Sequence, residues 1–242
     1  MEVKQHIKYD TAASAARIDS ILQSGYGDFE SVNDVPGRTD LTFKNGCYVN
    51  VSALFIDIVA SSEMTDFSKK ITLAKIYRCF ISECVAILSE LKFCQEVNIH
   101  GDCVWGVFDT KCQNQFDDLF DASAKLHSCV KIINEKLEKY GYQQIKVGIG
   151  CDFGRALMVK AGFYGSGIND VIWMGDVVNS ACHLSGEAGR EGKPVMLYAN
   201  AFYDKLSYSY KKLLGWYWSS SGSRVYGGTL INSKMEDYLT RM

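Results

Sequence analysis

The 242-residue sequence lacks the features that would divide it or attach it to a membrane. It contains only two prolines, so no proline-rich linker separates one part from another. It has no apolar run of 18 residues, and its first eight residues lack the apolar core of a signal peptide. We therefore expect one large domain, or one domain with additions, that buries a substantial core and neither spans nor enters a membrane.

The chain also lacks a strong charge bias and a cysteine framework. Its formal net charge is −2, which gives no electrostatic reason to expect a nucleic acid or an anionic membrane as partner. Its nine cysteines are odd in number and contain no C-x-x-C pair, and its four histidines are dispersed. This pattern argues against a zinc site or a disulfide framework and predicts reduced thiols in a cytoplasmic protein.

The first 45 residues are interpreted as an N-terminal extension, and residues 46–242 as the main domain. A short helix is predicted over 10–24, capped by Asp10 or Thr11. The following stretch up to Gly46 is polar and contains glycine and turn signals.

From residue 47 onward the apolar spacing alternates between strand and helix periods. The predicted strands are 47–57, 93–99, 102–108, 142–153, 194–198, 213–218 and 224–231. The predicted helices are 66–91, 115–139, 177–186 and 200–206, and residues 154–170 are expected to form a loop or short hairpin. This order indicates an α+β fold, a mostly antiparallel sheet with helices on one face. Neither a G-x-G-x-x-G nor a P-loop motif is present, so no Rossmann or P-loop phosphate cradle is expected.

A single carboxylate, Asp57, lies in the apolar stretch from Leu54 to Ser62. A buried carboxylate must be paired, hydrogen-bonded or bound to a metal ion, because an uncompensated buried charge is costly. Two interpretations stay open at this point. Asp57 either binds a ligand, or it caps the next helix or forms a salt bridge with a neighbour.

A second carboxylate, Asp102, begins a strand just after the tight turn at His100 and Gly101. Neighbouring strands lie about 4.8 Å apart, so Asp57 and Asp102 can converge at one edge of the sheet. Carboxylates without histidine or thiolate suit Mg²⁺ or Mn²⁺, and two such ions are a standard device for displacement at phosphorus. The alternative is two unrelated surface aspartates.

A third motif lies on the helix that follows Gly175. Asn179 and His183 are four residues apart and share one helix face, while Val178, Ala181 and Cys182 are expected to face the sheet. Taken alone, such a polar pair is equally typical of a solvated face.

Together these segments resemble the class III nucleotidyl cyclases, the family of adenylate and guanylate cyclase catalytic domains. Residues 55–62 (FIDIVASS) are similar to the family's strand with the first metal aspartate, and 100–108 (HGDCVWGVF) to its hairpin with the second. Residues 175–183 (GDVVNSACH) resemble its Asn-containing helix, and 145–150 occupy the place of the strand between them. The resemblance covers about residues 47–200 in the family's order.

The resemblance implies a palm-type, ferredoxin-like sheet that is active as a homodimer. It implies that Asp57, Asp102 and the Ile58 carbonyl hold two divalent metal ions, Mn²⁺ or Mg²⁺. Asn179 would orient the ribose and His183 would contact the phosphates. The reaction implied is attack of a ribose 3′-hydroxyl on the α-phosphate, with metals held by one subunit and the Asn helix supplied by the other.

The sequence departs from the purine cyclases where the family contacts the base. The lysine and aspartate of the family's pattern are replaced by Asn98 and Ile172. Isoleucine accepts no hydrogen bond from the adenine amino group, so ATP is disfavoured, and neither position fits the guanine pattern. His183 stands in place of the family's arginine and is fully charged only below about pH 6.5.

These departures and the tail over 225–232 resemble the pyrimidine cyclases of bacterial Pycsar antiphage systems. That resemblance implies cyclic UMP or cyclic CMP as product, with UTP favoured over CTP, and a cyclic-nucleotide-activated effector as the functional partner. Tyr48 is a candidate base contact, or else a sheet-face tyrosine. Arg224 and Lys234 are candidate phosphate contacts.

Two other functions remain open from the sequence. One is an adenylate or guanylate cyclase with a relaxed base pocket. The other is a domain that senses nucleotides without catalysis, which the presence of both Asp57 and Asp102 disfavours, because a binding domain needs no two-metal site.

Overall fold

The computed structural model describes residues 6–23, 25, 29–62, 64 and 70–241. The chain forms two compact units. Unit 1 comprises residues 1–50 and 155–176, and unit 2 comprises residues 51–154 and 177–242. The boundary at residue 45 between an extension and a catalytic domain stays a prediction.

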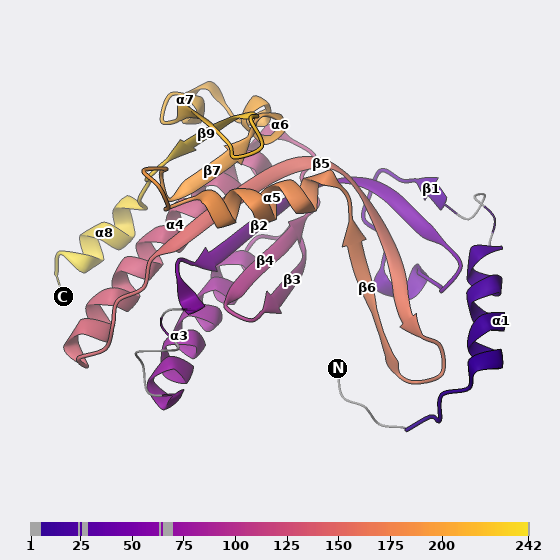
Figure 1. The fold of residues 1–242 in the computed structure, drawn as a ribbon. Coiled ribbons are helices and arrows are strands. Elements are labelled where there is room, and N and C mark those ends of the chain that lie inside the picture. The colour runs from indigo at the N-terminus through magenta and orange to yellow at the C-terminus, as the bar shows by residue number, and fades with distance from the viewer. Residues whose placement is uncertain (1–5, 24, 26–28, 63, 65–69, 242) are drawn as a thin grey trace. The chain divides into compact units, whose positions relative to one another are not determined.

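Unit 1 combines the N-terminal elements with a long β-hairpin (Figure 1). Its elements are α1 (Thr11–Leu22), β1 (Phe29–Ser31), a 3-10 helix (Arg38–Asp40), the start of β2 (Gly46–Ile58), the end of β5 (Val147–Phe163) and β6 (Ile168–Met174). The predicted cap of α1 is confirmed, because the Asp10 carboxylate accepts a hydrogen bond from the Ala13 backbone N–H at 2.8 Å. Residue 24, the predicted end of this helix, lies outside the described residues.

The prediction of a loop or short hairpin from Gly154 onward is wrong in its extent. Strand β5 continues through Gly154 to Phe163, and residues Leu157–Phe163 pair antiparallel with β6. One glycine inside a strand costs only about 1 kcal/mol, which the seven-residue pairing outweighs. The chain reverses instead at Gly165 and Gly167, whose φ angles of 85° and 74° suit glycine.

Unit 2 is built on a sheet in the order β3-β4-β2-β5-β7-β9-β8 (Figure 1). The pairs β3–β4, β4–β2, β7–β9 and β9–β8 are antiparallel, and β5 pairs parallel with β7. The other strands are β3 (Cys94–His100), β4 (Cys103–Phe108), β7 (Met196–Ala199), β8 (Gly215–Trp218) and β9 (Arg224–Gly228). The helices are α3 (Lys70–Ser89), α4 (Gln113–Lys139), α5 (Asp176–Glu187), α6 (Asn200–Lys205), α7 (Tyr208–Lys211) and α8 (Ser233–Leu239).

Most predicted elements of unit 2 are confirmed, with boundary shifts of a few residues. The hairpin of β3 and β4 and the long helix α4 agree most closely with the prediction. Helix α3 begins at Lys70, and the residues predicted to precede it, 66–69, lie outside the described residues. The short helices α7 and α8 were not predicted.

Helices α3 and α4 cover one face of the sheet and form the core of unit 2 with it. Leu54, Ile56 and Ile58 of β2 are at most 1% exposed and belong to the same apolar cluster as Phe80 of α3 and Leu119 of α4. In a strand, alternate residues point to opposite faces, so β2 presents its even-numbered residues to these helices.

Helix α5 packs against the opposite face, which the expectation of helices on one face did not include. Ile149 belongs to the core, whereas its neighbours Gly148 and Gly150 face α5. A Cβ atom at Gly150 would lie 2.2 Å from both the Ala181 carbonyl oxygen and the Ser185 nitrogen. The two glycines therefore allow the helix backbone to approach the strand closely.

Helix α5 is rotated about its axis by part of a turn relative to the prediction, so a different set of residues faces the sheet. Its buried residues are Val177, Ala181, Leu184 and Ser185. Cys182 is exposed and Val178 only half-buried, so of the three residues expected to face the sheet only Ala181 is buried. The helix phase is set by the close approach at Gly150, and it leaves Asn179 and His183 exposed.

All nine cysteines, which lie within the described residues, are free thiols. Among the described helices none has both the length and the apolar character needed to cross a membrane.

Candidate active site

The two predicted metal aspartates lie at neighbouring ends of β2 and β4. Ile56 of β2 pairs with Val104 of β4, Asp57 follows Ile56, and Asp102 precedes β4 in the hairpin turn. Burial and the negative charge of Asp102 both raise the pKa of Asp57 above its ordinary value, and the Arg190 guanidinium opposes this rise. The two carboxylates therefore interact directly through their charges.

Asp102 has an oxygen without a protein partner. Its Oδ2 atom is buried, and none of the described residues donates a hydrogen bond to it. Buried polar atoms are nearly always satisfied, so an orphaned carboxylate oxygen beside a second carboxylate fits a hard cation. The described residues contain no cluster of three or more His, Cys, Asp or Glu ligands. A cation here would complete its shell with backbone carbonyl, water and substrate phosphate oxygens, as Mg²⁺ commonly does.

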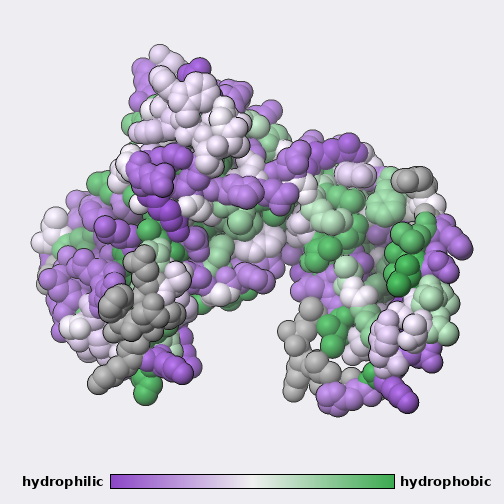
Figure 2. Space-filling model, in the orientation of Figure 1, coloured by the Kyte–Doolittle hydropathy of each residue, from purple (hydrophilic) through white to green (hydrophobic). Residues whose placement is uncertain are grey.

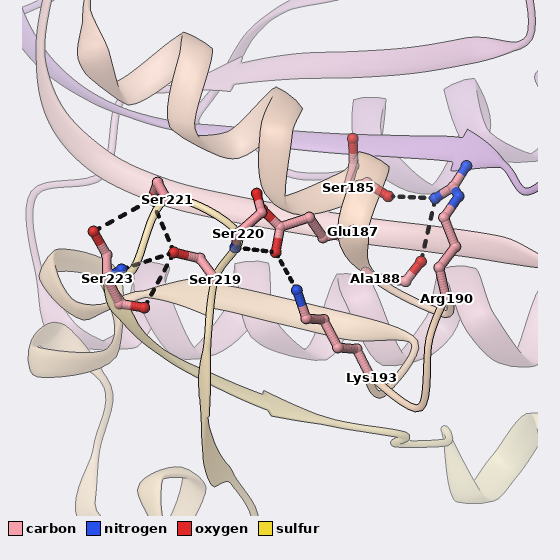
Figure 3. Close-up of polar contacts among 9 residues, drawn as sticks. All are labelled: Ser185, Glu187, Ala188, Arg190, Lys193, Ser219, Ser220, Ser221 and Ser223. Carbon is pink, nitrogen blue, oxygen red and sulfur yellow. Dashed lines mark hydrogen bonds and ion pairs between the residues drawn. The ribbon is translucent and has the colours of Figure 1, made fainter.

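Arg190 is a site residue that the sequence analysis missed. Its Nη2 lies 3.2 Å from Asp57 Oδ2, and its Nη1 donates to the Ser185 and Ala188 carbonyl oxygens at 3.0 and 3.3 Å (Figure 3). It thus connects the C-terminal end of α5 to the first aspartate. No local signal marks it, because 133 residues separate it from Asp57.

Asn98 lies on the same face of the sheet as Asp57. Asn98 of β3 pairs with Trp105 of β4, and Trp105 pairs with Phe55 of β2, two residues before Asp57. The Phe55 and Trp105 rings stack with centroids 4.9 Å apart. The Asn98 Nδ2 atom is buried and has no hydrogen-bond partner among the described residues. A hydrogen-bond donor therefore lies unsatisfied beside a stacked aromatic pair.

The Asn179 and His183 side chains lie on the exposed face of α5, one helical turn apart. His183 lines a groove of about 590 Å³ with Asp152, Asn200, Arg224 and four serines of the loop between β8 and β9, Ser219, Ser220, Ser221 and Ser223. Neither Asp57 nor Asp102 lines this groove. Of the two tail cations considered above, Arg224 lines it, whereas Lys234 lies in α8 and does not.

The serine loop is held in place by Glu187 at the end of α5 (Figure 3). The Glu187 carboxylate accepts hydrogen bonds from the Ser220 backbone N–H at 3.0 and 3.1 Å, and also from the Ser220 hydroxyl and Lys193. Burial alone would raise the pKa of Glu187, but the hydrogen bonds from Lys193 and Ser220 outweigh burial and lower it.

Tyr48 and Ile172, the remaining predicted base contacts, belong to unit 1. The Tyr48 ring lies 4.0 Å below the Arg155 guanidinium, and Arg155 also donates to the Ser31 hydroxyl. Ile172 pairs with Val159 in the β5–β6 hairpin, and its side chain is 41% exposed. Their roles in base recognition stay predictions.

Comparison with known proteins shows the family to which the chain belongs. No family model matches the chain. A uridylate cyclase of Gulbenkiania mobilis is 41% identical over 77% of this chain and 74% of its own length. A uridylate cyclase of Treponema porcinum is 35% identical over 86% of this chain and 72% of its own length. The adenylyl cyclase CyaB from P. aeruginosa has the same fold, with a TM-score of 0.64 and 14% identity over 75% of this chain and 94% of that protein. The chain belongs to the uridylate cyclases within the class III nucleotidyl cyclase family.

Proposed function

We propose that the protein is a uridylate cyclase that converts UTP to 3′,5′-cyclic UMP and pyrophosphate. The ribose 3′-oxygen attacks the α-phosphorus and gives its proton to solvent water, and the bond from the α-phosphorus to the bridging oxygen of pyrophosphate breaks. The observation that carries the proposal is the pair of carboxylates, Asp57 and Asp102, in a chain whose relatives at 35–41% identity are uridylate cyclases.

Asp57, Asp102 and the Ile58 carbonyl are the groups proposed to hold two Mn²⁺ or Mg²⁺ ions. The orphaned Asp102 oxygen and the mutual repulsion of the carboxylates support this assignment. When bound, the ions activate the attacking oxygen and neutralise phosphate charge. Arg190 forms an ion pair with Asp57 and orients its carboxylate.

Asn98 supports uracil as the preferred base. A uracil ring presents a carbonyl oxygen at position 4, whereas cytosine presents an amino group there. In the amide orientation that the structure shows, the unsatisfied Asn98 Nδ2 would donate a hydrogen bond to the uracil carbonyl oxygen. Cytosine would require the amide to turn and present its oxygen to the amino group, so the orientation present favours uracil.

Asn179 and His183 are proposed to complete the active site of a second subunit. Both are exposed on α5, and the groove beside His183 does not include the metal aspartates. Arg224 brings a permanent positive charge to that groove beside His183. In this arrangement α5 of one subunit covers the metal half-site of its partner in a homodimer.

A biological role in antiphage defence is part of the proposal. It is supported by the resemblance of the base-contact positions and of the tail to pyrimidine cyclases of Pycsar systems. Cyclic UMP would act as a second messenger for a separate effector protein, without a direct contact between the two.

The reaction is tested by incubating the purified protein with each of the four nucleoside triphosphates and Mn²⁺, followed by mass spectrometry of the products. We expect cyclic UMP from UTP as the main product. Cyclic CMP as main product would contradict the role given to Asn98. Cyclic AMP as main product would contradict a pyrimidine cyclase altogether.

The shared active site is tested by mixing two inactive variants, Asp102→Asn and Asn179→Ala. A mixed dimer contains one site with both substitutions and one site with neither, so mixing should restore part of the activity. Mixing Asp102→Asn with Asp57→Asn is the control, because both substitutions affect the same half-site and no intact site can form. Equal activity in the two mixtures would contradict a site shared between subunits.

A further inference from the structure

Unit 1 contains a second groove that the cyclase reaction does not use. The groove has a volume of about 690 Å³. Its lining comes from α1, from the loop that precedes β2, from β5 and from the turn of the β5–β6 hairpin. Figure 1 shows α1 alongside this hairpin. The lining residues are Arg17, Ser20, Ile21, Leu41, Thr42, Phe43, Lys44, Lys160 and Tyr164.

The groove collects positive charge. Among the residues that the structure describes, its lining holds Arg17, Lys44 and Lys160 and contains no Asp or Glu. Within the described part of the chain, none of these three cations forms a salt bridge. By contrast, Arg38 in the same unit is paired with Asp170. Three unpaired cations in one groove of a chain with net charge −2 favour an anionic ligand.

Aromatic rings lie beside two of these cations. The Arg17 guanidinium lies 4.6 Å from the centre of the Phe163 ring, and Lys160 Nζ lies 5.5 Å from that of Phe43. The Phe43 and Tyr164 rings meet edge to face with centroids 5.6 Å apart, and the Tyr164 side chain is 78% exposed. In Figure 2 the lobe that holds α1 and the hairpin shows apolar residues at its surface. The ligand that fits carries flat rings as well as negative charge.

We propose that this groove binds single-stranded nucleic acid without sequence preference. Cations that follow a phosphate backbone, with aromatic side chains on which bases stack, are the two elements that such sites combine. A site of this kind needs no divalent metal and does not involve Asp57 or Asp102. It is therefore independent of the proposed cyclase reaction.

The test is fluorescence anisotropy of the full chain with a labelled oligothymidylate of about 12 nucleotides, a length in the range that single-stranded sites cover. The measurement is made in EDTA, so that no metal-dependent binding contributes. We expect Lys44→Glu and Lys160→Glu each to weaken binding by at least about tenfold and to reduce the slope of log K against log salt by about 0.7, the value for one phosphate contact with a single strand. Lys139→Glu, a charge reversal on an exposed residue outside the groove, is the matched control and should leave binding unchanged.

The aromatic contribution is tested separately with Tyr164→Ala. This variant should weaken binding by about 5- to 150-fold, the range for loss of one stacked base, while the salt slope stays as in the wild type. The Asp102→Asn variant should bind the oligonucleotide normally, which separates this site from the cyclase centre.

Three results would overturn the proposal. One is an oligonucleotide that does not bind, and another is a Lys139→Glu variant that loses as much affinity as Lys44→Glu. The third is UMP that competes as well as the oligonucleotide at equal nucleotide concentration, because that result would identify a pocket for a single nucleotide. Circular dichroism of each variant shows whether a loss reflects unfolding, and the exposed Lys44 is the substitution with the smallest structural consequence.

Discussion

The contact between α5 and β5 makes Gly150→Ala the most informative substitution in the chain. The Cβ atom that alanine adds would lie 2.2 Å from the Ala181 oxygen and from the Ser185 nitrogen, both of which are backbone atoms. An ordinary contact is at least 3.4 Å, so α5 must move away from the sheet by about 1.2 Å, the difference between the two values. No side-chain rotation relieves this overlap.

This displacement should reduce both stability and activity. Overpacking of a closely packed contact typically costs about 1–3 kcal/mol of unfolding free energy. A catalytic group misplaced by about 1 Å can lose about 100-fold in rate, and α5 carries Asn179 and His183. Urea unfolding followed by circular dichroism measures the first effect, and the rate of cyclic UMP formation measures the second.

Gly186→Ala is the matched control, because it makes the same chemical change in α5 itself. A Cβ atom at Gly186 meets no heavy atom within 4 Å. Alanine is the better helix former by up to about 1 kcal/mol, so this variant should be slightly more stable and fully active. Wild-type stability and rate in Gly150→Ala, or equal damage from Gly186→Ala, would refute the reasoning.

Three other predictions follow from the site. Mn²⁺ at about 100 times its Kd should stabilise the protein by about 2.7 kcal/mol and raise Tm by roughly 5–10 °C in a thermal melt. Asp102→Asn should abolish this rise in Tm. An unchanged rise in the variant would show that Asp102 does not bind the metal ion. Glu187→Gln should reduce the unfolding free energy by roughly 1.5–3 kcal/mol. The pKa of Glu187 is lowered in the folded state, so the loss of unfolding free energy should be complete above the ordinary glutamate pKa of about 4.3. The loss should shrink as the pH falls through the folded-state pKa. Urea titrations at several pH values would measure it. Arg224→Ala should lower kcat/KM for UTP by about 10- to 100-fold, with partial recovery in Arg224→Lys. Lys234→Ala, outside the groove, should retain wild-type kinetics. Equal losses in Arg224→Ala and Lys234→Ala would contradict a phosphate contact by Arg224.

Much of the fold of unit 2 was predictable because its signals are local. The amphipathic period of α4 and the tight turn between β3 and β4 each depend on residues that are adjacent in the chain. The misjudged extent of the β5–β6 hairpin shows the limit of local signals. Gly154 looks like a strand end in isolation, and only the partner strand β6 shows that pairing continues past it.

The sequence by itself determined that the chain is a nucleotidyl cyclase. A carboxylate in an apolar strand, a second after a tight turn, and the polar pair Asn179 and His183 can be recognised without coordinates. Each is a short pattern whose function depends on the type of its own residues. The family comparison confirms the cyclase identity that these patterns indicated.

Only the tertiary structure decided which distant residues meet. Arg190 reaches Asp57 across 133 residues of sequence, and Arg224 shares a groove with His183. The same holds for the cations of unit 1. Net charge is a sum over the whole chain, so a value of −2 cannot show that Arg17, Lys44 and Lys160 line one groove. The pairing and packing of strands and helices bring these distant residues together. Composition and local sequence patterns carry no information about which distant residues come into contact.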